Sequence, residues 1–505
     1  MKRDSVRPES RGSAFTQQNY SPGGAMIGGT LVLTGSRMVF FVCGYIVHVF
    51  LARYLQPQLF GVWGVILGIL TVYQMIVMSG PSKAISKFTA ERADQARSIQ
   101  NQGLKIQIIL SGILCVFMGI AAHWIARLLK DLTLTPYIRA TVFFFPVYAL
   151  YAVYLGTLNG LRAFDRQALV MTAYSLLRMI GIVALVLLGY RVYGVLGGSW
   201  LAMFVAIFIA RRFCTCPVAD HTFEGQRIIR FALPVSFFAL ALAAFSNLDI
   251  FLLKALLGSN EDVGFYTAAV VLVKVPYLLL FGLNTTLFPV VAQSLWDPTY
   301  SKAKFYISRS LRYALLIVTP TAFVTAATSR ELILLIYTSQ YISASEPLRI
   351  LIFGYVFASI FMIASTVIMA VGKPRIAMGI VFLMVGLDFV LNYALIPQFG
   401  LTGAALATSA AAFIGVFGGL AYIFRRFGQL LNPISLVKIT GVSIGLCVPC
   451  VFFDMRGMWL LIYYAVAIVL YIGFLALLKE LGEEEWSIFK RAFVPQTVRK
   501  RHNGS

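Results

Sequence analysis

Charged residues are scarce in this sequence: they make up 12% of its 505 residues, against 59% hydrophobic residues. So few charges cannot provide the polar surface that a soluble protein of this length needs, which excludes an ordinary globular domain. Long apolar runs recur along the whole chain instead, and about 20 mostly apolar residues are enough to cross a bilayer as an α-helix. The sequence therefore predicts an all-α polytopic membrane protein.

Fourteen apolar runs are long enough to be transmembrane helices. The polar residues 1–24 that precede them contain no apolar core, so no cleavable signal peptide is expected. The runs cover residues 28–52, 60–79, 104–128, 139–160, 168–189, 194–212, 231–256, 263–291, 310–337, 347–371, 376–397, 402–424, 434–453 and 457–478.

Cysteine and histidine are also rare, with six and four residues. The cysteines do not form the dense framework of a disulfide-rich secreted domain. Cys447 and Cys450 have metal-like spacing but lie within an apolar run, and Cys214, Cys216 and His221 lack a fourth ligand. We expect these side chains to pack rather than to bind a metal, and we predict no cofactor.

Sequence signatures of catalysis are missing too. The chain contains no GxxxxGK[ST] phosphate loop, no HExxH metal helix and no GxSxG nucleophile elbow. A membrane-bound sugar polymerase or ligase is the alternative from a different class, but such an enzyme needs a long outer loop, and every predicted outer loop is short. We therefore predict that the protein is not an enzyme and has no catalytic residues.

Acidic residues are few, 20 Asp and Glu against 42 Lys and Arg, and the net charge is +22. Nucleic-acid binding could explain such a charge, but the Lys and Arg residues gather in the two tails and in alternate loops, including residues 80–102 and 211–230. This distribution follows the positive-inside rule and predicts that both termini lie in the cytoplasm. We expect attraction to anionic membrane lipids and no nucleic-acid partner.

Two sequence patterns occur twice. FGVW at 60–63 returns as VGFY at 263–266, and YGVLGGSWLA at 193–202 returns as FGLTGAALAT at 399–408, with offsets of 203 and 206 residues. Similar offsets at both ends of a block of six helices indicate duplication of a six-helix unit, and an even number of helices inserts both copies in the same sense. The sequence predicts two six-helix lobes related by a pseudo-two-fold axis along the membrane normal, plus two C-terminal helices.

The predicted domain organisation follows from this duplication. Its parts are a disordered cytoplasmic tail at 1–24, an N-terminal six-helix lobe at 25–212, a cytoplasmic linker at 213–230, a C-terminal six-helix lobe at 231–426, helices 13 and 14 at 427–480, and a basic cytoplasmic tail at 481–505.

Three cationic residues lie inside apolar runs, where a charge costs roughly 2.5–3.5 kcal/mol on insertion scales. Arg37 shares one helical stripe with His48 in the first run. Arg178 is the only charge in the fifth run, and Lys274 lies in the eighth. A purely structural scaffold would not need such charges, so we interpret them as facing a cavity. An internal ion pair, for example with Asp249, is the alternative.

Acidic and amide side chains interrupt two other runs. Asp388 and Asn392 are four residues apart in the eleventh run and therefore share a helix face. Asn247 and Asp249 in the seventh run point about 200° apart, so they cannot both face a cavity squarely. Asp249 is the better candidate, because a carboxylate in lipid is costlier than an amide. A cation or proton site and a purely interhelical polar contact are both open interpretations of Asp388 and Asn392.

Two further stretches identify a family. Asp249 is followed by GSNEDVGFYTAA at 258–269, and IPQFGLTGAALATS occupies 396–409. At these residues, and over about 25–480, the chain resembles the polysaccharide transporters of the multidrug/oligosaccharidyl-lipid/polysaccharide exporter superfamily. The resemblance implies two six-helix bundles around a central cavity that opens alternately to either side of the membrane.

The resemblance also implies a function: a flippase that moves undecaprenyl-diphosphate-linked oligosaccharide from the cytoplasmic to the outer leaflet of the bacterial inner membrane. A polysaccharide polymerase and chain-length proteins are the partners it implies. A lipid II flippase usually carries several basic residues in its first helices, whereas this chain has only Arg37 there and Arg53 at the margin. A cation-coupled multidrug exporter usually has a more acidic interior. Both stay as alternatives within the superfamily.

A lipid diphosphate brings negative charge into the membrane plane, where cationic groups in a low-dielectric cavity attract it strongly. Intramembrane carboxylates are the groups that would couple transport to an ion. The expected site residues are Arg37, Lys274 and Arg178 for substrate binding, and Asp249, Asp388 and Asn392 for ion coupling.

Overall fold

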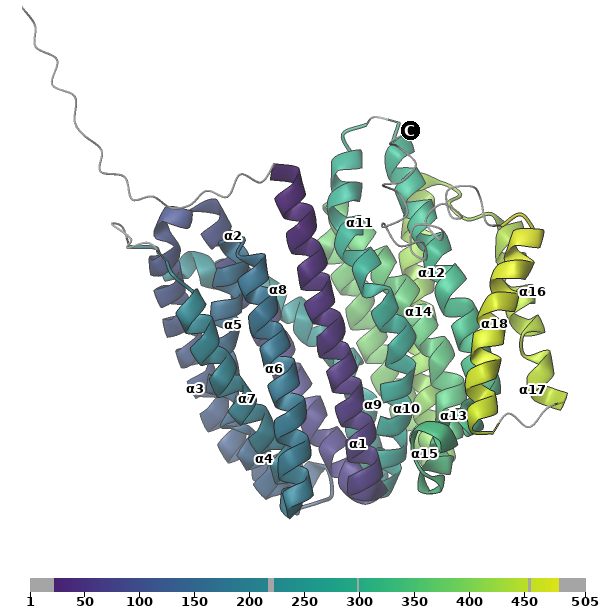
Figure 1. Ribbon diagram of the computed structural model, residues 1–505, viewed down its shortest axis with the longest axis horizontal. Helices are drawn as coiled ribbons and strands as arrows, with labels where there is room; N and C mark the ends of the chain where they lie inside the picture. The colour runs from purple at the N-terminus through teal and green to yellow at the C-terminus, as the bar shows by residue number, and fades with distance from the viewer. Residues whose placement is uncertain (1–21, 217–221, 298, 453–455, 481–505) are drawn as a thin grey trace, which may run out of the picture.

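The computed structural model describes residues 22–216, 222–297, 299–452 and 456–480. The predicted tail at 481–505, most of the predicted tail at 1–24, and His221 lie outside these residues. All regular secondary structure in the described part of the chain is helical (Figure 1). The predicted all-α fold is therefore confirmed.

The helices follow one another with short connections. Two of the short segments, η1 and η3, are 3-10 turns, and η2 is a π turn. In chain order the elements are α1 (Pro22–Ser79), α2 (Pro81–Glu91), η1 (Ala93–Gln95), α3 (Ala96–Leu128), α4 (Leu134–Thr141), α5 (Phe144–Gly160), α6 (Phe164–Leu185), η2 (Val186–Tyr190), α7 (Arg191–Phe213), α8 (Gly225–Phe245), α9 (Leu248–Leu257), α10 (Asn260–Leu279), α11 (Phe281–Ser294), α12 (Ser301–Ala327), α13 (Ser329–Ile336), η3 (Ser339–Ala344), α14 (Ser345–Ala370), α15 (Pro374–Phe427), α16 (Pro433–Gly445), α17 (Val448–Phe452) and α18 (Met458–Leu477).

Ten helical stretches within the described residues are long and apolar enough to cross a membrane. Three of them, Val32–Glu91, Phe164–Phe213 and Pro374–Phe427, each cover all or most of two predicted runs. Each of these three is interrupted by a residue with positive φ, namely Gln56, Gly189 and Gly400. The predicted run at 263–291 falls on α10 and α11. The protein is a multi-pass membrane protein, and the count of fourteen spans stays a prediction.

The predicted run at 231–256 is not one helix. α8 ends at Phe245 and α9 begins at Leu248, and Asn247 between them has a non-helical φ of −139°. The prediction that Asn247 and Asp249 point about 200° apart assumed an unbroken helix, and the break at Asn247 removes that assumption. Both side chains are buried.

The helices form two groups around α1. Figure 1 shows α2–α7 on one side and α10–α18 on the other. One end of the bundle carries α2 and the beginnings of α12 and α16, and we name it the α2 end. The opposite end, the α4 end, carries α4, α13 and the turn between α9 and α10. Below, α1–α7 form the first lobe and α8–α15 the second.

The hydrophobic cores show where the two lobes meet. The largest core contains residues of α1, α5 and α7 from the first lobe together with residues 250–273 and 322–352 from the second. The half of the second lobe nearer the α2 end has a separate core, built from the end of α8 and from α11, α12, α14 and α15. The lobes therefore share a core toward the α4 end and have separate cores toward the α2 end.

Two glycines mark the pseudo-two-fold axis. A Cβ at Gly61 would overlap the carbonyl oxygen of Asn260, and a Cβ at Gly264 would overlap the carbonyl oxygen of Pro57. Gly61 and Gly264 are 203 residues apart, and so are Pro57 and Asn260. At a two-fold axis each residue meets the copies of its own neighbours, so this reciprocity supports the predicted duplication.

Gly61→Ala is expected to destabilise the protein, because the new methyl group forces α1 and α10 apart; such overpacking costs about 1–3 kcal/mol. Thermal unfolding of the purified protein measures the effect. Gly35→Ala is the matched control on the same helix, since nothing lies within 4 Å of its added Cβ. Equal unfolding temperatures for the two variants would contradict the close approach at Gly61.

Candidate functional site

Asp249 lies in the first turn of α9 and is 2% exposed. Its Oδ1 accepts a hydrogen bond from the Ile250 N–H at 2.8 Å, and its Oδ2 accepts one from the Tyr266 hydroxyl of α10 at 2.7 Å. The dipole of α9 also favours a negative charge in this first turn. Both carboxylate oxygens of Asp249 are therefore held in place.

Asp388 and Asn392 are fully buried on α15, and the prediction that they share a helix face is confirmed. The Asn392 amide donates to Asp388 Oδ1 at 2.9 Å and to the Asp388 carbonyl at 2.8 Å. Their other oxygens, Asp388 Oδ2 and Asn392 Oδ1, are buried and have no hydrogen-bond partner within the described residues. A buried oxygen without a partner costs roughly 1–3 kcal/mol, so this pair suits a bound proton or cation.

Thr408 completes the group from the second half of α15. Its buried hydroxyl has no hydrogen-bond partner of normal geometry in the described part of the chain, and it lies close to both Asp388 and Tyr266. Asp388 also lies within electrostatic range of Asp249. We name Asp249, Asp388, Asn392 and Thr408 the oxygen cluster. Because hard cations prefer oxygen ligands, a cation such as Na⁺ or a proton matches this set.

Lys274 is half-buried on α10, the helix that also carries Tyr266. Its charge acts on Asp249 and on His48 of α1, but it forms no salt bridge within the described residues. Arg178 of α6 also acts on His48, whose buried Nδ1 has no hydrogen-bond partner there. The structure thus brings a cation from each lobe into electrostatic range of one histidine.

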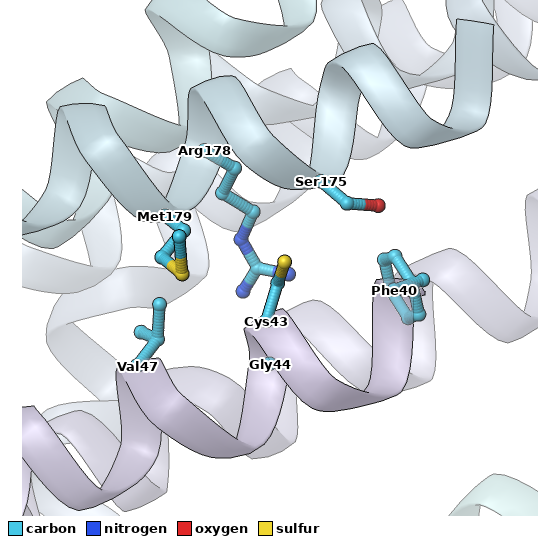
Figure 2. Close-up of a pocket in the computed structure, with 7 residues that line it drawn as sticks. All are labelled: Phe40, Cys43, Gly44, Val47, Ser175, Arg178 and Met179. Atoms are coloured by element: carbon cyan, nitrogen blue, oxygen red, sulfur yellow. The ribbon is translucent and has the colours of Figure 1, made fainter. Parts of the chain in front are cut away.

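Arg178 reaches from α6 toward α1 beside a small cavity (Figure 2). Among the described residues it forms no salt bridge, and its buried Nε has no hydrogen-bond partner. The cavity has a volume of about 10 Å³, which is room for one water molecule. The lining residues are Phe40, Cys43, Gly44, Val47, Ser175, Arg178 and Met179.

Arg37 lies apart from this group. It is half-buried on the same stripe of α1 as His48, eleven residues closer to the α2 end. At a rise of 1.5 Å per residue the two positions are about 16 Å apart along the helix. The structure therefore places Arg37 on the α2 side of the cluster, not within it.

Two members of the site were not predicted as functional residues. Tyr266 and Thr408 lie within the stretches GSNEDVGFYTAA and IPQFGLTGAALATS, but a single hydroxyl in an apolar helix is usually a packing residue. The sequence offered one signal: each of these stretches closely follows one of the predicted acidic site residues, Asp249 or Asp388. Their roles depend on contacts between α9, α10 and the two halves of α15, which the linear sequence does not display.

Arg178→Met is expected to leave the protein at least as stable as the parent, because the change removes a half-buried charge that has no carboxylate partner. Lys254→Met is the matched control. Lys254 is fully buried and pairs with Asp131 at 2.9 Å, so its loss should cost about 3–5 kcal/mol. Thermal unfolding compares the two variants. A greater loss in Arg178→Met than in Lys254→Met would mean that Arg178 is a structural residue.

Solved structures with the same fold are membrane transporters. "Lipid II flippase MurJ, inward closed conformation" superposes with a TM-score of 0.75 at 16% identity and covers 92% of this chain and 100% of that one. An inward-facing "multidrug resistance MATE family transporter of the MOP superfamily" gives a TM-score of 0.67 at 16% identity, over 79% and 98% of the two chains. At this identity the likeness shows the fold alone.

Three relatives match parts of the sequence. The uncharacterized membrane protein MJ1068 of Methanocaldococcus jannaschii is 30% identical over 168 residues, 33% of each chain. The "probable low-salt glycan biosynthesis flippase Agl15" of Haloferax volcanii is 28% identical over 40% of this chain and 44% of its own length. The uncharacterized membrane protein YabM of Bacillus subtilis is 22% identical over 77% and 78%. The matches to the first two therefore span less than half of those proteins.

Family models agree with this fold. The model described as MatE matches residues 213–394. The model described as "Polysaccharide biosynthesis protein" matches residues 26–295, more than half of the chain. The chain belongs to the polysaccharide biosynthesis protein family, within the multidrug/oligosaccharidyl-lipid/polysaccharide exporter superfamily.

Proposed function

We propose that the protein is a flippase that moves a lipid-linked oligosaccharide across the membrane by alternating access of its two lobes. The observation that carries the proposal is the pair Arg178 and Lys274, one from each lobe, whose charges both act on His48. Membership of the family, the flippase relative Agl15 and the fold shared with a lipid II flippase support it.

The proposed substrate is an oligosaccharide on a polyprenyl diphosphate, which is undecaprenyl diphosphate in a bacterial membrane. A diphosphate needs cationic partners, and in a low-dielectric cavity their attraction is strong. Arg178 can hold phosphate oxygens in a bidentate way, whereas Lys274 acts as a point charge. Arg37, nearer the α2 end, would meet the diphosphate first when the substrate enters from that end.

The oxygen cluster is the proposed coupling site. Binding of a cation or a proton there would neutralise the repulsion between Asp249 and Asp388 and give the unpartnered oxygens of Asp388 and Asn392 a partner. Asp249 belongs to α9 and Asp388 to α15, so the ion would tie these two helices together. Release of the ion would free them to separate.

The α2 end is the proposed cytoplasmic end, because described Lys and Arg residues of the basic stretches 80–102 and 211–230 lie there, on and beside α2, the end of α7 and the start of α8. We propose the bacterial inner membrane as the location, and a polysaccharide polymerase and chain-length proteins as partners that use the flipped product.

A lipid II flippase is the second candidate, favoured by the superposition with that fold. A drug exporter is less favoured, because Arg178 and Lys274 would repel cationic drugs.

Arg37→Ala and Arg178→Ala are each expected to reduce flipping of a lipid-linked oligosaccharide in proteoliposomes by about tenfold or more, since a hydrogen bond to a charged group contributes about 1.5–3 kcal/mol. Arg37→Lys should retain part of the activity, because it keeps the charge and loses the bidentate contact. Arg212→Ala, an exposed arginine at the end of α7, is the control. Normal flipping by Arg37→Ala at normal expression would remove Arg37 from the phosphate site.

Asp388→Asn and Asp249→Asn are expected to abolish the dependence of flipping on a Na⁺ or proton gradient while the protein stays in the membrane. The reason is that an amide cannot supply the negative charge that binds the ion. Flipping rates with and without each gradient measure this, and Asp94→Asn, at an exposed aspartate, serves as the control. If both Asn variants respond to the gradients as the parent does, these carboxylates are structural polar contacts.

A further inference from the structure

We infer that the α4 end is held shut by two clasps between the lobes, in pseudo-symmetric positions, and that both must release before this end can open. The first clasp consists of Lys130, Asp131, Lys254 and Asn260; the second consists of Arg53 and Tyr341 with the carbonyls they bind. The inference rests on the proposed alternating access, but its residues lie outside the proposed substrate and ion sites.

The first clasp joins the turn after α3 to the turn between α9 and α10. Lys254 Nζ lies 2.9 Å from Asp131 Oδ2, and the Asn260 amide donates to the same oxygen at 2.7 Å. In the opposite direction Lys130 Nζ donates to the Leu256 carbonyl at 3.0 Å. Each lobe thus contributes a lysine that binds the other lobe.

Burial makes this clasp unlike a surface ion pair. The Lys254 side chain is 0% exposed and that of Asp131 is 11% exposed. The second contact of the ammonium, to the Gly258 carbonyl at 2.8 Å, stays within the second lobe. Opening of the α4 end would therefore leave a buried ammonium without its carboxylate until water enters, which is costly in a low-dielectric interior.

The second clasp joins α1 to the end of α13. Arg53 Nε donates to the Ile336 carbonyl and its Nη2 to the Leu335 carbonyl, both at 2.8 Å. These are carbonyls of the last turn of α13, where no intrahelical partner is available and a cation is favoured. Close by, the Tyr341 hydroxyl donates to the Ala52 carbonyl at 2.8 Å.

The two clasps follow the sequence repeat. Arg53 and Lys254 are 201 residues apart, and the segments that they bind, at 131 and 335, are 204 residues apart. Both values are close to the offset of 203 that relates Gly61 to Gly264. A cation of each lobe therefore binds a turn of the other lobe, as a two-fold axis requires.

α9 connects the first clasp to the oxygen cluster. Asp249 and Lys254 lie on this ten-residue helix, which begins after the non-helical Asn247 and ends at Gly258 with a φ of +74°. A short helix between two such breaks can move as a rigid body. A displacement of α9 at Asp249 would therefore be transmitted to Lys254.

The first clasp is not built to release in acid. Burial acts to raise the pKa of Asp131, but hydrogen bonds from Thr133, Lys254 and Asn260 outweigh it, and the pKa is lowered from the ordinary value of 3.8. A lowered pKa in the folded protein means that the contribution of the ion pair is lost only as the pH falls through that lowered value. The clasp should stay charged at neutral and mildly acidic pH.

The test measures the distance between spin labels at exposed positions on the α4 end, Leu132 of the first lobe and Leu334 of the second, in the full chain in lipid nanodiscs. The labels are attached to non-natural amino acids, so the native cysteines stay in place. Asp131→Asn is expected to raise the population with the longer distance about tenfold or more. Arg53→Met should act in the same direction, and the charge-reversed pair Asp131→Lys with Lys254→Asp should restore part of the short distance.

Glu224→Gln is the matched control, because it breaks an ion pair of 3.0 Å that is exposed and local to the linker. If Asp131→Asn fails to fold, Asn260→Ala removes one hydrogen bond and leaves the ion pair intact. Unchanged distances in folded Asp131→Asn, Asn260→Ala and Arg53→Met would overturn the inference. Flipping by the parent protein is measured separately. If the distances respond to the substitutions but the parent does not flip lipid, the clasps are supported and the proposed function is refuted. If the parent flips lipid but the distances do not respond, the proposed function is supported and the clasps are refuted.

Discussion

The close backbone approach at Gly61 and Gly264 is the contact on which the arrangement of the lobes depends. With no side chain at either glycine, the second half of α1 lies against α10 at the pseudo-two-fold axis, and the reciprocal positions Pro57 and Asn260 meet each other's glycine. The shared core toward the α4 end forms around this crossing. Any motion that opens the α4 end must separate or pivot these helices, because the crossing leaves no room for a side chain.

Pairing distinguishes the charges that hold the structure together from those proposed to bind substrate or ion. Lys254 and Asp131 satisfy each other, and Arg53 satisfies the carbonyls at the end of α13. Arg178, in contrast, has a buried nitrogen without a partner, and Asp388 a buried oxygen without one, within the described residues. Unsatisfied buried polar groups cost stability, so an arrangement that retains them points to a ligand that supplies the missing partner.

Much of the fold follows from the sequence because apolar length, charge bias and repetition are properties of the chain itself. The shared face of Asp388 and Asn392 needs only the helical period, and the FGVW and VGFY copies make Gly61 and Gly264 equivalent positions of the repeat. The break before Leu248 was not foreseen, since the stretch FALALAAFSNLDIF has no proline or glycine at that point. The Asp131–Lys254 pair joins residues 123 positions apart, and no local pattern encodes such a contact.

The predicted span at 231–256, which is broken between α8 and α9, contacts both lobes. The beginning of α8 packs with the first lobe: Ile228 and Ala232 share a small core with Ala84, Ile99 and Val153 of α2, α3 and α5. α9, beyond the break, holds Asp249 near Asp388 of the second lobe. A continuous helix would tie the two lobes rigidly to each other along its whole length. The end of α8 already packs in the second lobe's core through Ala241 and Phe245. The non-helical Asn247, whose amide donates to the Ala243 carbonyl at 2.8 Å, is therefore a joint between a helix that contacts both lobes and the short α9. This span, rather than the linker at 213–230 alone, is thus where relative motion of the lobes can be accommodated.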